Sequence, residues 1–347
     1  MIKALVADDS SLMRLIVSDI LNEDKEIQVV GTVSNGKEAV EEAIRIKPDV
    51  LVLDMNMGEF DGTYTVRRLM KEFPMPIVIL SALGNTNLEP ILEALKLGAF
   101  DYVNKPDKNK TKVREVGSEL VSKVKASVRQ FNLKGAERVS EYKPNQNPHT
   151  FSGESNYDII AIGASTGGPT AIENVIGKFP VNLPIPVVVV QHMPKNFINS
   201  FADRLDKLVP INVKVAEQNE VVYPGNIYII PGGKNMVVRY ANNKRNVKFD
   251  ETEERFKEFN NPSIDGFMVS VAETYRERSI GVILTGMGKD GGIGLEKIKK
   301  AGGLTLAQDE RSSVVFGMPK VVIDKGCVDF VLPVKEIGGF IVNSIDN

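Results

Sequence analysis

Short apolar runs alternate with amphipathic stretches along residues 1–128. Five runs have the length and the Val, Ile and Leu content of buried strands, and each is followed by apolar positions at helical spacing. The predicted strands are Lys3–Ala7, Gln28–Val33, Asp49–Leu53, Pro76–Leu80 and Asp101–Val103. The predicted helices are Leu12–Asn22, Gly36–Ile46, Thr63–Phe73, Leu88–Leu97 and Val113–Phe131. Five such repeats predict an α/β domain with a doubly wound parallel sheet.

The apolar periodicity stops over residues 129–156, where Pro, Asn, Ser and Gly accumulate, so this segment is predicted to be a linker. His149 lies in it and is expected to be exposed and without a role.

A second α/β domain is predicted over residues 157–347. Its fully apolar runs predict parallel strands at Asp158–Ile162, Pro186–Val190, Ile280–Leu284, Leu304–Ala307 and Val328–Leu332. Helices are expected near 169–179, 197–208, 263–276, 291–300, 318–324 and 334–343. Four short runs around residues 211–249 are expected to form an antiparallel β insertion.

Composition narrows the class of protein. The chain has 347 residues, is 42% apolar and 25% charged, and carries a formal charge of −2, which excludes wholesale disorder and argues against a basic nucleic-acid binder. A single cysteine, Cys327, allows no intrachain disulfide, and with two histidines a Cys/His zinc site is nearly excluded. We expect Cys327 to be a packing residue. No apolar run is long enough to span a membrane and no secretory-type segment opens the chain, so a cytoplasmic protein is expected.

One segment is uneven in charge. Residues 105–143 contain eleven Lys or Arg and five Asp or Glu. This pattern is typical of a solvated helix and linker, and the alternative is a surface for an acidic partner.

Polar side chains follow the strands predicted in the first domain. Asp8 and Asp9 follow the first strand, Asp54 the third, Ser81 the fourth and Lys105 the fifth. In an open parallel sheet the functional groups gather beyond the carboxyl ends of the strands, so these side chains meet if the strands are neighbours. The alternative is that each one merely caps a helix or ends a strand.

Three carboxylates in one place repel one another and require a cation, and oxygen ligands alone select a hard one such as Mg²⁺. With a lysine and a hydroxyl beside it, the cation would neutralise a phosphoryl group, and Asp54 would be the nucleophile that accepts it.

Residues 1–125 resemble a response-regulator receiver domain, which has a flavodoxin-like fold. The resemblance is carried by Asp8-Asp9, by Asp54 after DVLVL, by Ser81 after PIVIL and by Lys105-Pro106 after DYVN. It implies that Mg²⁺ is bound by Asp8, Asp9, Asp54 and the backbone of Asn56.

The resemblance further implies that Asp54 takes phosphoryl from a histidine kinase, that Ser81 and Lys105 contact the phosphoryl group, and that Tyr102 is the switch aromatic. One position departs from the pattern. Receivers often have Pro where this chain has Gly58, and glycine loosens a turn that proline makes rigid.

A second candidate site begins with the sequence GASTG at residues 163–167, which fits G-x-S-x-G between a predicted strand and a predicted helix. Small residues allow the tight turn that would expose the hydroxyl of Ser165. The loop could instead hold a phosphate or cofactor, or be a structural turn, although it lacks the lysine of a P-loop.

His192 and Asp290 follow two other parallel strands of this domain. Each has an ordinary alternative, a structural histidine and a helix N-cap. Together with Ser165 they predict a triad in which Ser165 attacks an acyl carbon, His192 takes its proton and Asp290 orients the imidazole. The chain order Ser, His, Asp is not that of the common α/β-hydrolases.

Six motifs make the chain resemble the chemotaxis protein-glutamate methylesterases, the CheB family, over nearly its whole length. They are GASTGGP (163–169), QHMP (191–194), YIIPGG (228–233), NPSID (261–265), ILTGMGKDG (283–291) and AQDERSSVVFGMP (307–319). The implied fold of the second domain is a Rossmann-like parallel sheet with a β insertion. The triad roles fall on Ser165, His192 and Asp290, the N–H of Met287 is the candidate oxyanion donor, and the esterase site needs no cofactor.

The resemblance implies that the substrate is a glutamyl methyl ester on the cytoplasmic domain of a chemoreceptor, with methanol released, and that receptor glutamines are a second substrate for deamidation. The phosphodonor would be the chemotaxis histidine kinase. An unphosphorylated receiver would cover the triad, and phosphorylation of Asp54 would loosen it. We expect a monomer that binds no nucleic acid and does not insert into membranes.

One departure concerns this site: the family usually has a histidine where this chain has Asn235, which cannot act as a base. Two other functions are weighed against the esterase. One is a receiver-regulated binding module without chemistry. The other is a DNA-binding regulator, which is disfavoured because residues 157–347 contain no compact helix-turn-helix pattern.

Overall fold

The computed structural model describes residues 1–81, 89–105, 110–134, 155–241, 247–251 and 262–346. The chain divides into two compact units, Met1–Ser140 and Glu141–Asn347. The domain limits at 128 and 156 stay predictions.

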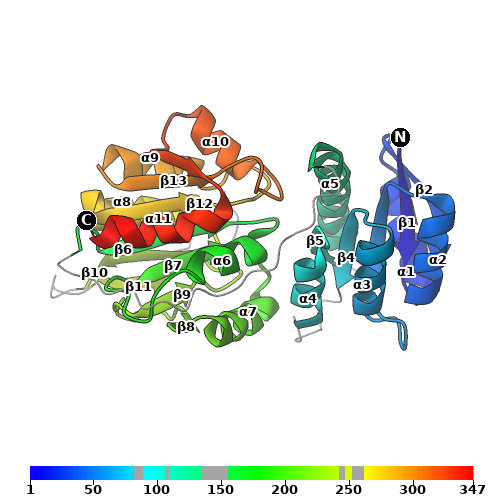
Figure 1. Cartoon of the computed structure of the whole chain (residues 1–347), viewed down its shortest axis with the longest axis horizontal. Coiled ribbons are helices and arrows are strands. Elements are labelled where there is room, and N and C mark those ends of the chain that lie inside the picture. Colours follow the sequence, from blue (N-terminus) through cyan, green and yellow to red (C-terminus); the bar gives the residue numbers. More distant parts are fainter. Residues whose placement is uncertain (82–88, 106–109, 135–154, 242–246, 252–261, 347) are drawn as a thin grey trace. The chain divides into compact units, whose positions relative to one another are not determined.

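Unit 1 is a five-stranded parallel sheet with the order β2-β1-β3-β4-β5 (Figure 1). Its strands are β1 (Ile2–Ala7), β2 (Ile27–Val33), β3 (Val50–Asp54), β4 (Ile77–Ser81) and β5 (Asp101–Asn104). Its helices are α1 (Ser11–Asn22), α2 (Gly36–Ile46), α3 (Gly62–Glu72), α4 (Glu89–Leu97) and α5 (Lys110–Lys134). The predicted parallel sheet of five βα repeats is therefore confirmed.

The fully apolar strands are the buried ones. Every residue of β3 and β4 is buried, as their Val, Ile and Leu content predicts for central strands covered on both faces. Helix α1 packs against α5, while α2, α3 and α4 form a row of neighbours, so helices cover both faces of the sheet (Figure 1).

Helix α5 continues beyond the predicted end of the first domain. It reaches Lys134, so the first residues of the predicted linker are helical, and residues 135–154, including His149, lie outside the described residues. Lysines of the basic segment 105–143 pair with acids of unit 1, and two of them lie in α5. Lys125 contacts Asp24 at 2.8 Å, and the nearly buried Lys123 contacts Asp101 at 2.9 Å. Part of the positive charge is therefore balanced within the unit.

Unit 2 contains a seven-stranded parallel sheet with the order β14-β13-β12-β6-β7-β9-β8. Its strands are β6 (Ile159–Ala164), β7 (Val187–Gln191), β8 (Asn212–Val215), β9 (Asn226–Ile229), β12 (Ser279–Ile283), β13 (Leu304–Gln308) and β14 (Phe330–Leu332). The predicted α/β fold of the second domain is confirmed.

The predicted antiparallel insertion is wrong for half of its strands. Strands β8 and β9 pair in parallel and extend the main sheet beyond β7, and only β10 (Met236–Tyr240) and β11 (Val247–Glu251) form an antiparallel pair. The physical reason is the length of the connection. Residues 216–225 exceed a tight hairpin loop, so the turn that would make β8 and β9 an antiparallel pair is not present.

Helices cover both faces of this sheet as well (Figure 1). Its helices are α6 (Gly168–Ile176), α7 (Lys195–Leu208), α8 (Ile264–Tyr275), α9 (Gly292–Lys300), α10 (Met318–Asp324) and α11 (Val334–Asp346). Helix α6 packs against α7 and α11, while α9 packs against α8 and α10, and strand β10 lies on α8. Cys327 is buried in the core, where its thiol lies 3.2 Å from the carbonyl of Val322.

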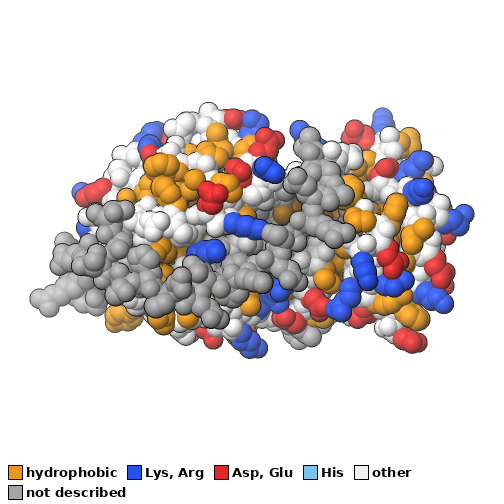
Figure 2. Space-filling view, viewed as in Figure 1, with side chains coloured by type: hydrophobic (Ala, Val, Ile, Leu, Met, Phe, Trp, Pro, Cys, Tyr) orange, Lys and Arg blue, Asp and Glu red, His pale blue; other side chains and the backbone are white. Residues whose placement is uncertain are grey.

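The surface agrees with a mixed charge balance. On the face shown in Figure 2, the described Lys and Arg side chains stand among Asp and Glu side chains rather than in one basic patch. Among the described helices, none is both long and apolar enough to cross a membrane.

Candidate functional sites

Both candidate sites lie where the strand order of their sheet reverses. In unit 1 the chain proceeds from β1 outward to β2 on one side, and then to β3, β4 and β5 on the other. Asp8 and Asp9 follow β1, and Asp54 is the last residue of β3 beside it. The carboxyl ends at such a switch point form a crevice in which helices on opposite faces diverge.

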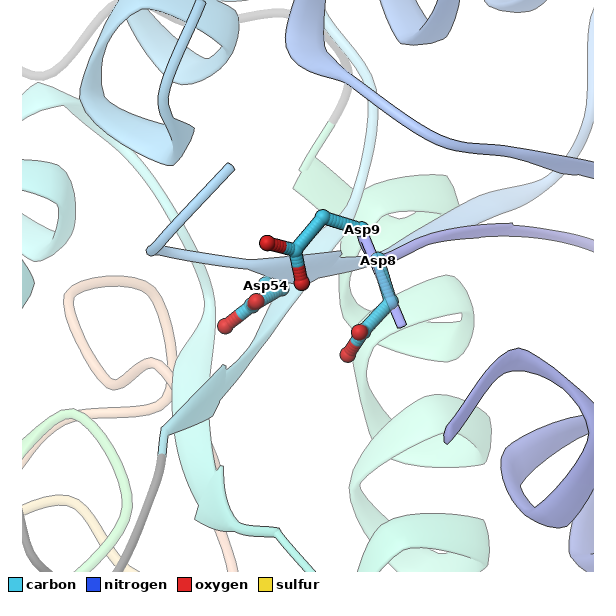
Figure 3. Close-up of side chains that lie close together, drawn as sticks. All are labelled: Asp8, Asp9 and Asp54. Atoms are coloured by element: carbon cyan, nitrogen blue, oxygen red, sulfur yellow. The ribbon is translucent and has the colours of Figure 1, made fainter. Parts of the chain in front are cut away.

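The three carboxylates meet there, as predicted (Figure 3). One oxygen of each of Asp8, Asp9 and Asp54 lies within 4.8 Å of the others, and Asp8 and Asp54 are buried while Asp9 is exposed. Lys105, just beyond β5, reaches back across the sheet and places its Nζ 2.8 Å from Asp8 Oδ2 and 2.7 Å from Asp54 Oδ2.

The pKa values of Asp54 and Lys105 are set by burial and by the excess of carboxylates over cations in this cluster. Burial raises the pKa of Asp54, and although Lys105 and the N–H of Asn56 lower it, the neighbouring charge of Asp8 helps to keep it above the ordinary value. Burial lowers the pKa of Lys105, but its two carboxylate partners outweigh this, so its pKa is raised. Three carboxylates with one lysine leave an uncompensated negative charge.

An oxygen-only donor set with surplus negative charge fits a hard cation such as Mg²⁺ and offers no nitrogen or sulfur ligand to a softer metal. The capping alternative is partly true as well. Asp8 Oδ1 accepts a hydrogen bond of 2.9 Å from the N–H of Ser10, the N-cap of α1, so one side chain both shapes the turn and faces the cluster.

The remaining predicted residues of unit 1 lie at or near this edge. Ser81 ends β4, is buried, and its hydroxyl has no hydrogen-bond partner among the described residues. The N–H of Lys105 donates to the carbonyl of Ser81 at 2.6 Å, which fixes the two strand ends side by side. Tyr102 is buried in β5 with its ring centroid 5.4 Å from Lys123 Nζ, and burial raises its pKa well above the ordinary value.

Gly58 has a positive φ of 71°, and a Cβ added there would meet nothing within 4 Å. Proline is fixed near a φ of about −65° and cannot adopt this conformation. The departure from the receiver pattern therefore gives the loop a different backbone path as well as more freedom.

The second site is built on three adjacent strands of unit 2. Ser165 follows β6, the strand at which the order of the sheet reverses, and Gly168 N–H closes the turn by donating to the Ser165 carbonyl at 2.7 Å. Gly167 has a φ of 74°, and a Cβ there would lie 2.4 Å from Val314, so this turn requires glycine. The strand–turn–helix context predicted for the serine is present.

Ser165, His192 and Asp290 form a continuous chain of hydrogen bonds. Ser165 Oγ lies 3.2 Å from His192 Nδ1, and His192 Nε2 lies 2.8 Å from Asp290 Oδ2. With its proton on Nε2, the imidazole donates to Asp290 and leaves Nδ1 free to accept the proton of the serine hydroxyl.

Asp290 is held by three backbone donors, two from the start of α8 and one from the adjacent Gly291. Its Oδ2 also accepts from the N–H of Ile264 at 2.9 Å, and its Oδ1 accepts from the N–H groups of Asp265 at 2.8 Å and Gly291 at 3.0 Å. Burial raises the pKa of Asp290, but the hydrogen bond and charge of His192 and these N–H donors outweigh it, so the pKa is lowered.

The alternative role of Asp290 as N-cap of the following helix is wrong. The N-cap of α9 is Gly291, which makes no side-chain capping bond. Asp290 instead binds the first N–H groups of α8, where an anion is stabilised by the helix dipole.

Comparison with known proteins gives the relationships of both units. The family model described as CheB methylesterase matches residues 160–341, and the one described as response regulator receiver domain matches residues 4–115. A protein-glutamate methylesterase/protein-glutamine glutaminase of Archaeoglobus fulgidus is 42% identical over 345 residues, which is 99% of this chain and 98% of that one. The chain belongs to the CheB methylesterase family.

Two further relatives of the family span the chain or its second unit. A protein-glutamate methylesterase/protein-glutamine glutaminase of Geobacillus kaustophilus is 39% identical and covers 99% of both chains. The crystal structure of the Thermotoga maritima CheB methylesterase catalytic domain is 42% identical with a TM-score of 0.52, covering 54% of this chain and 98% of that one.

Met287, the candidate oxyanion donor of this CheB methylesterase site, lies on the loop that joins β12 to Asp290. The N–H of Met287 has no acceptor among the described residues, and it is flanked by two glycines. A Cβ on Gly286 would come 2.8 Å from Ser165 Cβ, so the loop can approach the serine this closely only as glycine.

Sequence reasoning assigned no role to two residues that support the triad. Gln191, the last residue of β7, is buried and donates from Nε2 to the carbonyls of Ser165 at 3.0 Å and His192 at 3.1 Å. A polar residue ending an apolar strand next to His192 was the available signal. Asp265 accepts from two N–H groups of α9, and its position in the NPSID motif gave no indication of that partner.

Asn235 is buried, and its Oδ1 accepts a hydrogen bond of 2.8 Å from the N–H of Ser263, the N-cap of α8. Asn235 therefore supports the helix whose first turn holds Asp290.

Proposed function

We propose that this chain is a phosphorylation-activated serine hydrolase that removes methyl esters from glutamates of chemoreceptors and releases methanol. The observation that carries the proposal is the chain of contacts from Ser165 through His192 to Asp290 at the carboxyl ends of adjacent strands. The relatives named as protein-glutamate methylesterases support the reaction and its substrate.

Acylation begins when Ser165 Oγ attacks the ester carbonyl carbon and gives its proton to His192 Nδ1. The imidazolium that forms is stabilised by Asp290, whose pKa is lowered, so it stays ionised throughout. The N–H of Met287 is positioned on the adjacent loop to bind the oxyanion. The tetrahedral intermediate then expels methanol, which takes the proton from Nδ1 and leaves Ser165 acylated.

Deacylation reverses the proton transfers. A water molecule attacks the acyl carbon while His192 Nδ1 takes a proton from it, and the proton is returned to Ser165 as glutamate leaves. A glutamine side chain can pass through the same acyl-enzyme with ammonia as the leaving group, which accounts for the second activity in the relatives' names.

In unit 1, Asp54 is the proposed acceptor of phosphoryl from a chemotaxis histidine kinase. Mg²⁺, held by Asp8, Asp9, Asp54 and the backbone of Asn56, would supply positive charge that offsets the phosphoryl oxygens. Lys105 already contacts Asp54 and provides a second positive charge, and the unpartnered hydroxyl of Ser81 can donate to a phosphoryl oxygen.

We infer a cytoplasmic location from the proposed receptor substrate and the proposed kinase. Phosphorylation of Asp54 is proposed to raise esterase activity by releasing the triad from the receiver, with Tyr102 as the switch residue.

The test is methanol release from methyl-labelled receptor membranes by the full-length chain, with and without acetyl phosphate as phosphodonor. Ser165→Ala should lower release at least about 1,000-fold, because the nucleophile is lost. Asp54→Asn should keep basal release but lose the stimulation by acetyl phosphate.

Two outcomes would contradict parts of this function. Release unchanged by Ser165→Ala would remove the esterase and favour a binding module. Methanol release unaffected by acetyl phosphate would support the esterase and contradict its activation by phosphorylation.

Deletion of the receiver should raise basal release, and the cut belongs at residue 140 rather than 130, because α5 continues to Lys134 and the first unit to Ser140.

A further inference from the structure

Helices α8 and α9 begin beside each other, and each presents backbone N–H groups that its own first turn cannot use. The N–H groups of Ile264 and Asp265 at the start of α8 donate to Asp290, which precedes α9. The N–H groups of Ile293 and Gly294 at the start of α9 donate, both at 2.7 Å, to Oδ1 of Asp265, which lies in α8. The start of each helix is therefore bound by a carboxylate from the start of the other helix.

The close packing of the two helices fixes this exchange. A Cβ added to Gly294 would lie 2.5 Å from Met268 Cβ and 3.0 Å from the carbonyl of Asp265, so the start of α9 rests directly on the first turns of α8. Gly291 has a φ of 91° and a Cβ there would lie 2.4 Å from Ile283, so the chain between Asp290 and α9 has little room to move.

We propose that Asp265 is a positioning residue of the triad, which acts through Asp290 by holding the start of α9 against α8. It touches neither substrate nor the reacting atoms. By binding Ile293 and Gly294 it sets where Asp290 stands, and Asp290 in turn orients His192. This inference rests on the proposed esterase function of Ser165.

The chemistry of Asp265 distinguishes positioning from simple stabilisation. Its carboxylate is only 3% exposed and faces the charge of Asp290, and burial raises its pKa to about 6. Ionised Asp265 therefore lowers the stability of the fold at neutral pH, and a neutral acceptor of the same shape would be more stable. Positioning needs only the oxygen that accepts from Ile293 and Gly294, so a neutral acceptor at residue 265 should keep the triad in place.

The experiment compares Asp265→Ala, Asp265→Asn and a matched control in the full-length chain. The control is Asp329→Ala, because Asp329 also accepts from the N–H and hydroxyl of Thr305, at 3.0 Å and 2.8 Å. Asp329 pairs as well with Lys299 in the last turn of α9, so the control loosens the end of that helix while Asp265 binds its start. Steady-state methanol release gives kcat and KM, thermal unfolding gives stability, and Ser165→Ala reports whether the release belongs to this site.

A second readout does not need substrate. The chain has two histidines, so ¹⁵N-histidine labelling in a His149→Gln background leaves His192 as the single imidazole observed by NMR. The proton on its Nε2, which bonds Asp290, reports directly on the orientation that Asp265 is proposed to maintain.

We expect Asp265→Ala to lower kcat about tenfold or more with little change in KM, and to lose the Nε2 proton signal. Asp265→Asn keeps an acceptor for Ile293 and Gly294 and should retain the signal and kcat within about threefold. Asp329→Ala should lower the melting temperature and leave kcat and the signal unchanged. If the alanine variant does not fold, Asp265→Ser replaces it, since its side chain is too short to hold both N–H groups.

The proposal is overturned if Asp265→Ala keeps both kcat and the signal, if it raises KM alone, or if Asp329→Ala loses as much kcat for an equal loss of stability. If no variant, including the unaltered chain, releases methanol, the esterase function fails while the NMR signal still decides the role of Asp265.

Discussion

The two candidate sites share their place in the fold and differ in their charge balance. Both lie beyond the carboxyl ends of parallel strands, at the point where the strand order of a doubly wound sheet reverses. In unit 1, Lys105 is shared by Asp8 and Asp54, with Asp9 close by. In unit 2, the one triad carboxylate receives four donors, three of them backbone N–H groups.

This difference separates two ways of using buried carboxylates. A cluster of carboxylates with too few positive charges favours binding of a cation, and its net charge changes when the cation binds. A carboxylate with every acceptor filled is fixed in place and can orient a histidine for proton transfer. The same switch-point geometry can therefore suit both a site that would receive a charged group and a site that would move a proton.

The largest effect on methanol release should come from Asp290→Asn in unit 2, where the carboxylate has all its acceptors filled. The remaining oxygen would still accept from Asp265 and Gly291. The amide nitrogen in place of Oδ2 would face His192 and force its proton onto Nδ1, where the proton of Ser165 must go. Methanol release should fall about 10³-fold to 10⁴-fold. A variant with normal melting temperature and near-normal release would show that Asp290 does not set the tautomer.

Lys105→Met should break the other site by leaving two carboxylates without their shared cation. Unfolding free energy should fall by about 3 kcal/mol, and Mg²⁺ should restore most of it by supplying charge to the same oxygens. Urea unfolding with and without MgCl₂ measures both. Lys125→Met is the control, because Lys125 pairs with Asp24 at the surface, so its loss should change stability little and without dependence on Mg²⁺. If the two variants lost the same stability and responded equally to Mg²⁺, the idea that the cluster of Asp8, Asp9 and Asp54 lacks positive charge would be wrong.

Asp265→Asn tests whether unit 2 keeps a costly buried charge. The folded pKa of about 6 lies above the ordinary 3.8, so the native chain gains stability from protonating Asp265 as pH falls, and loses that contribution as pH rises through about 6. The asparagine variant should therefore be more stable than the native chain at pH 8, by about 1–3 kcal/mol, and the advantage should vanish near pH 4. Urea unfolding across this range would contradict the idea if the difference were independent of pH.

Gly58→Ala tests the loop that follows Asp54, one of the three clustered carboxylates. A side chain at positive φ costs about 1 kcal/mol, and Gly58→Pro should cost more because its ring cannot adopt that φ. The control is Gly225→Ala in unit 2, where φ is also 71° and the Cβ meets nothing within 4 Å. Both alanine variants should lose similar stability, but only the one at residue 58 should change the rate at which acetyl phosphate modifies Asp54.

Asn235→His should have the smallest effect. Asn235 supplies an acceptor to Ser263, and a neutral imidazole nitrogen can do the same, so release should stay within about threefold of the native rate. Asn235→Ala removes the acceptor and should cost about 1–2 kcal/mol of stability. A rise of more than tenfold for the histidine variant would show that residue 235 limits catalysis.

Sequence patterns predicted the main elements well because burial on both faces leaves a clear local signature. The apolar runs of unit 1 coincide with β1 to β5 within a residue or two at each end, and helix α2 begins and ends as predicted. The pattern failed for β8 and β9, because a short strand of mixed polarity carries no information about the direction of its partner. It also failed at the end of α5, where the helix extends into a segment without apolar periodicity.

The residues at the strand ends could likewise be named from the sequence, and the structure brings Ser165, His192 and Asp290 together as predicted. The supporting contacts could not be named, because they join residues far apart in the chain. Asp265 meets Ile293 and Gly294 across separations of 28 and 29 residues, and Asn235 meets Ser263 across 28.

The sequence by itself determined which side chains stand at the ends of which strands, since alternating apolar and amphipathic segments fix strands, helices and the turns between them. Only the tertiary structure decided what those side chains bind. Whether Asp290 caps its own helix or holds the start of another depends on how closely α8 and α9 approach. That approach is set by packing at Gly294 and Met268, which local sequence pattern does not record.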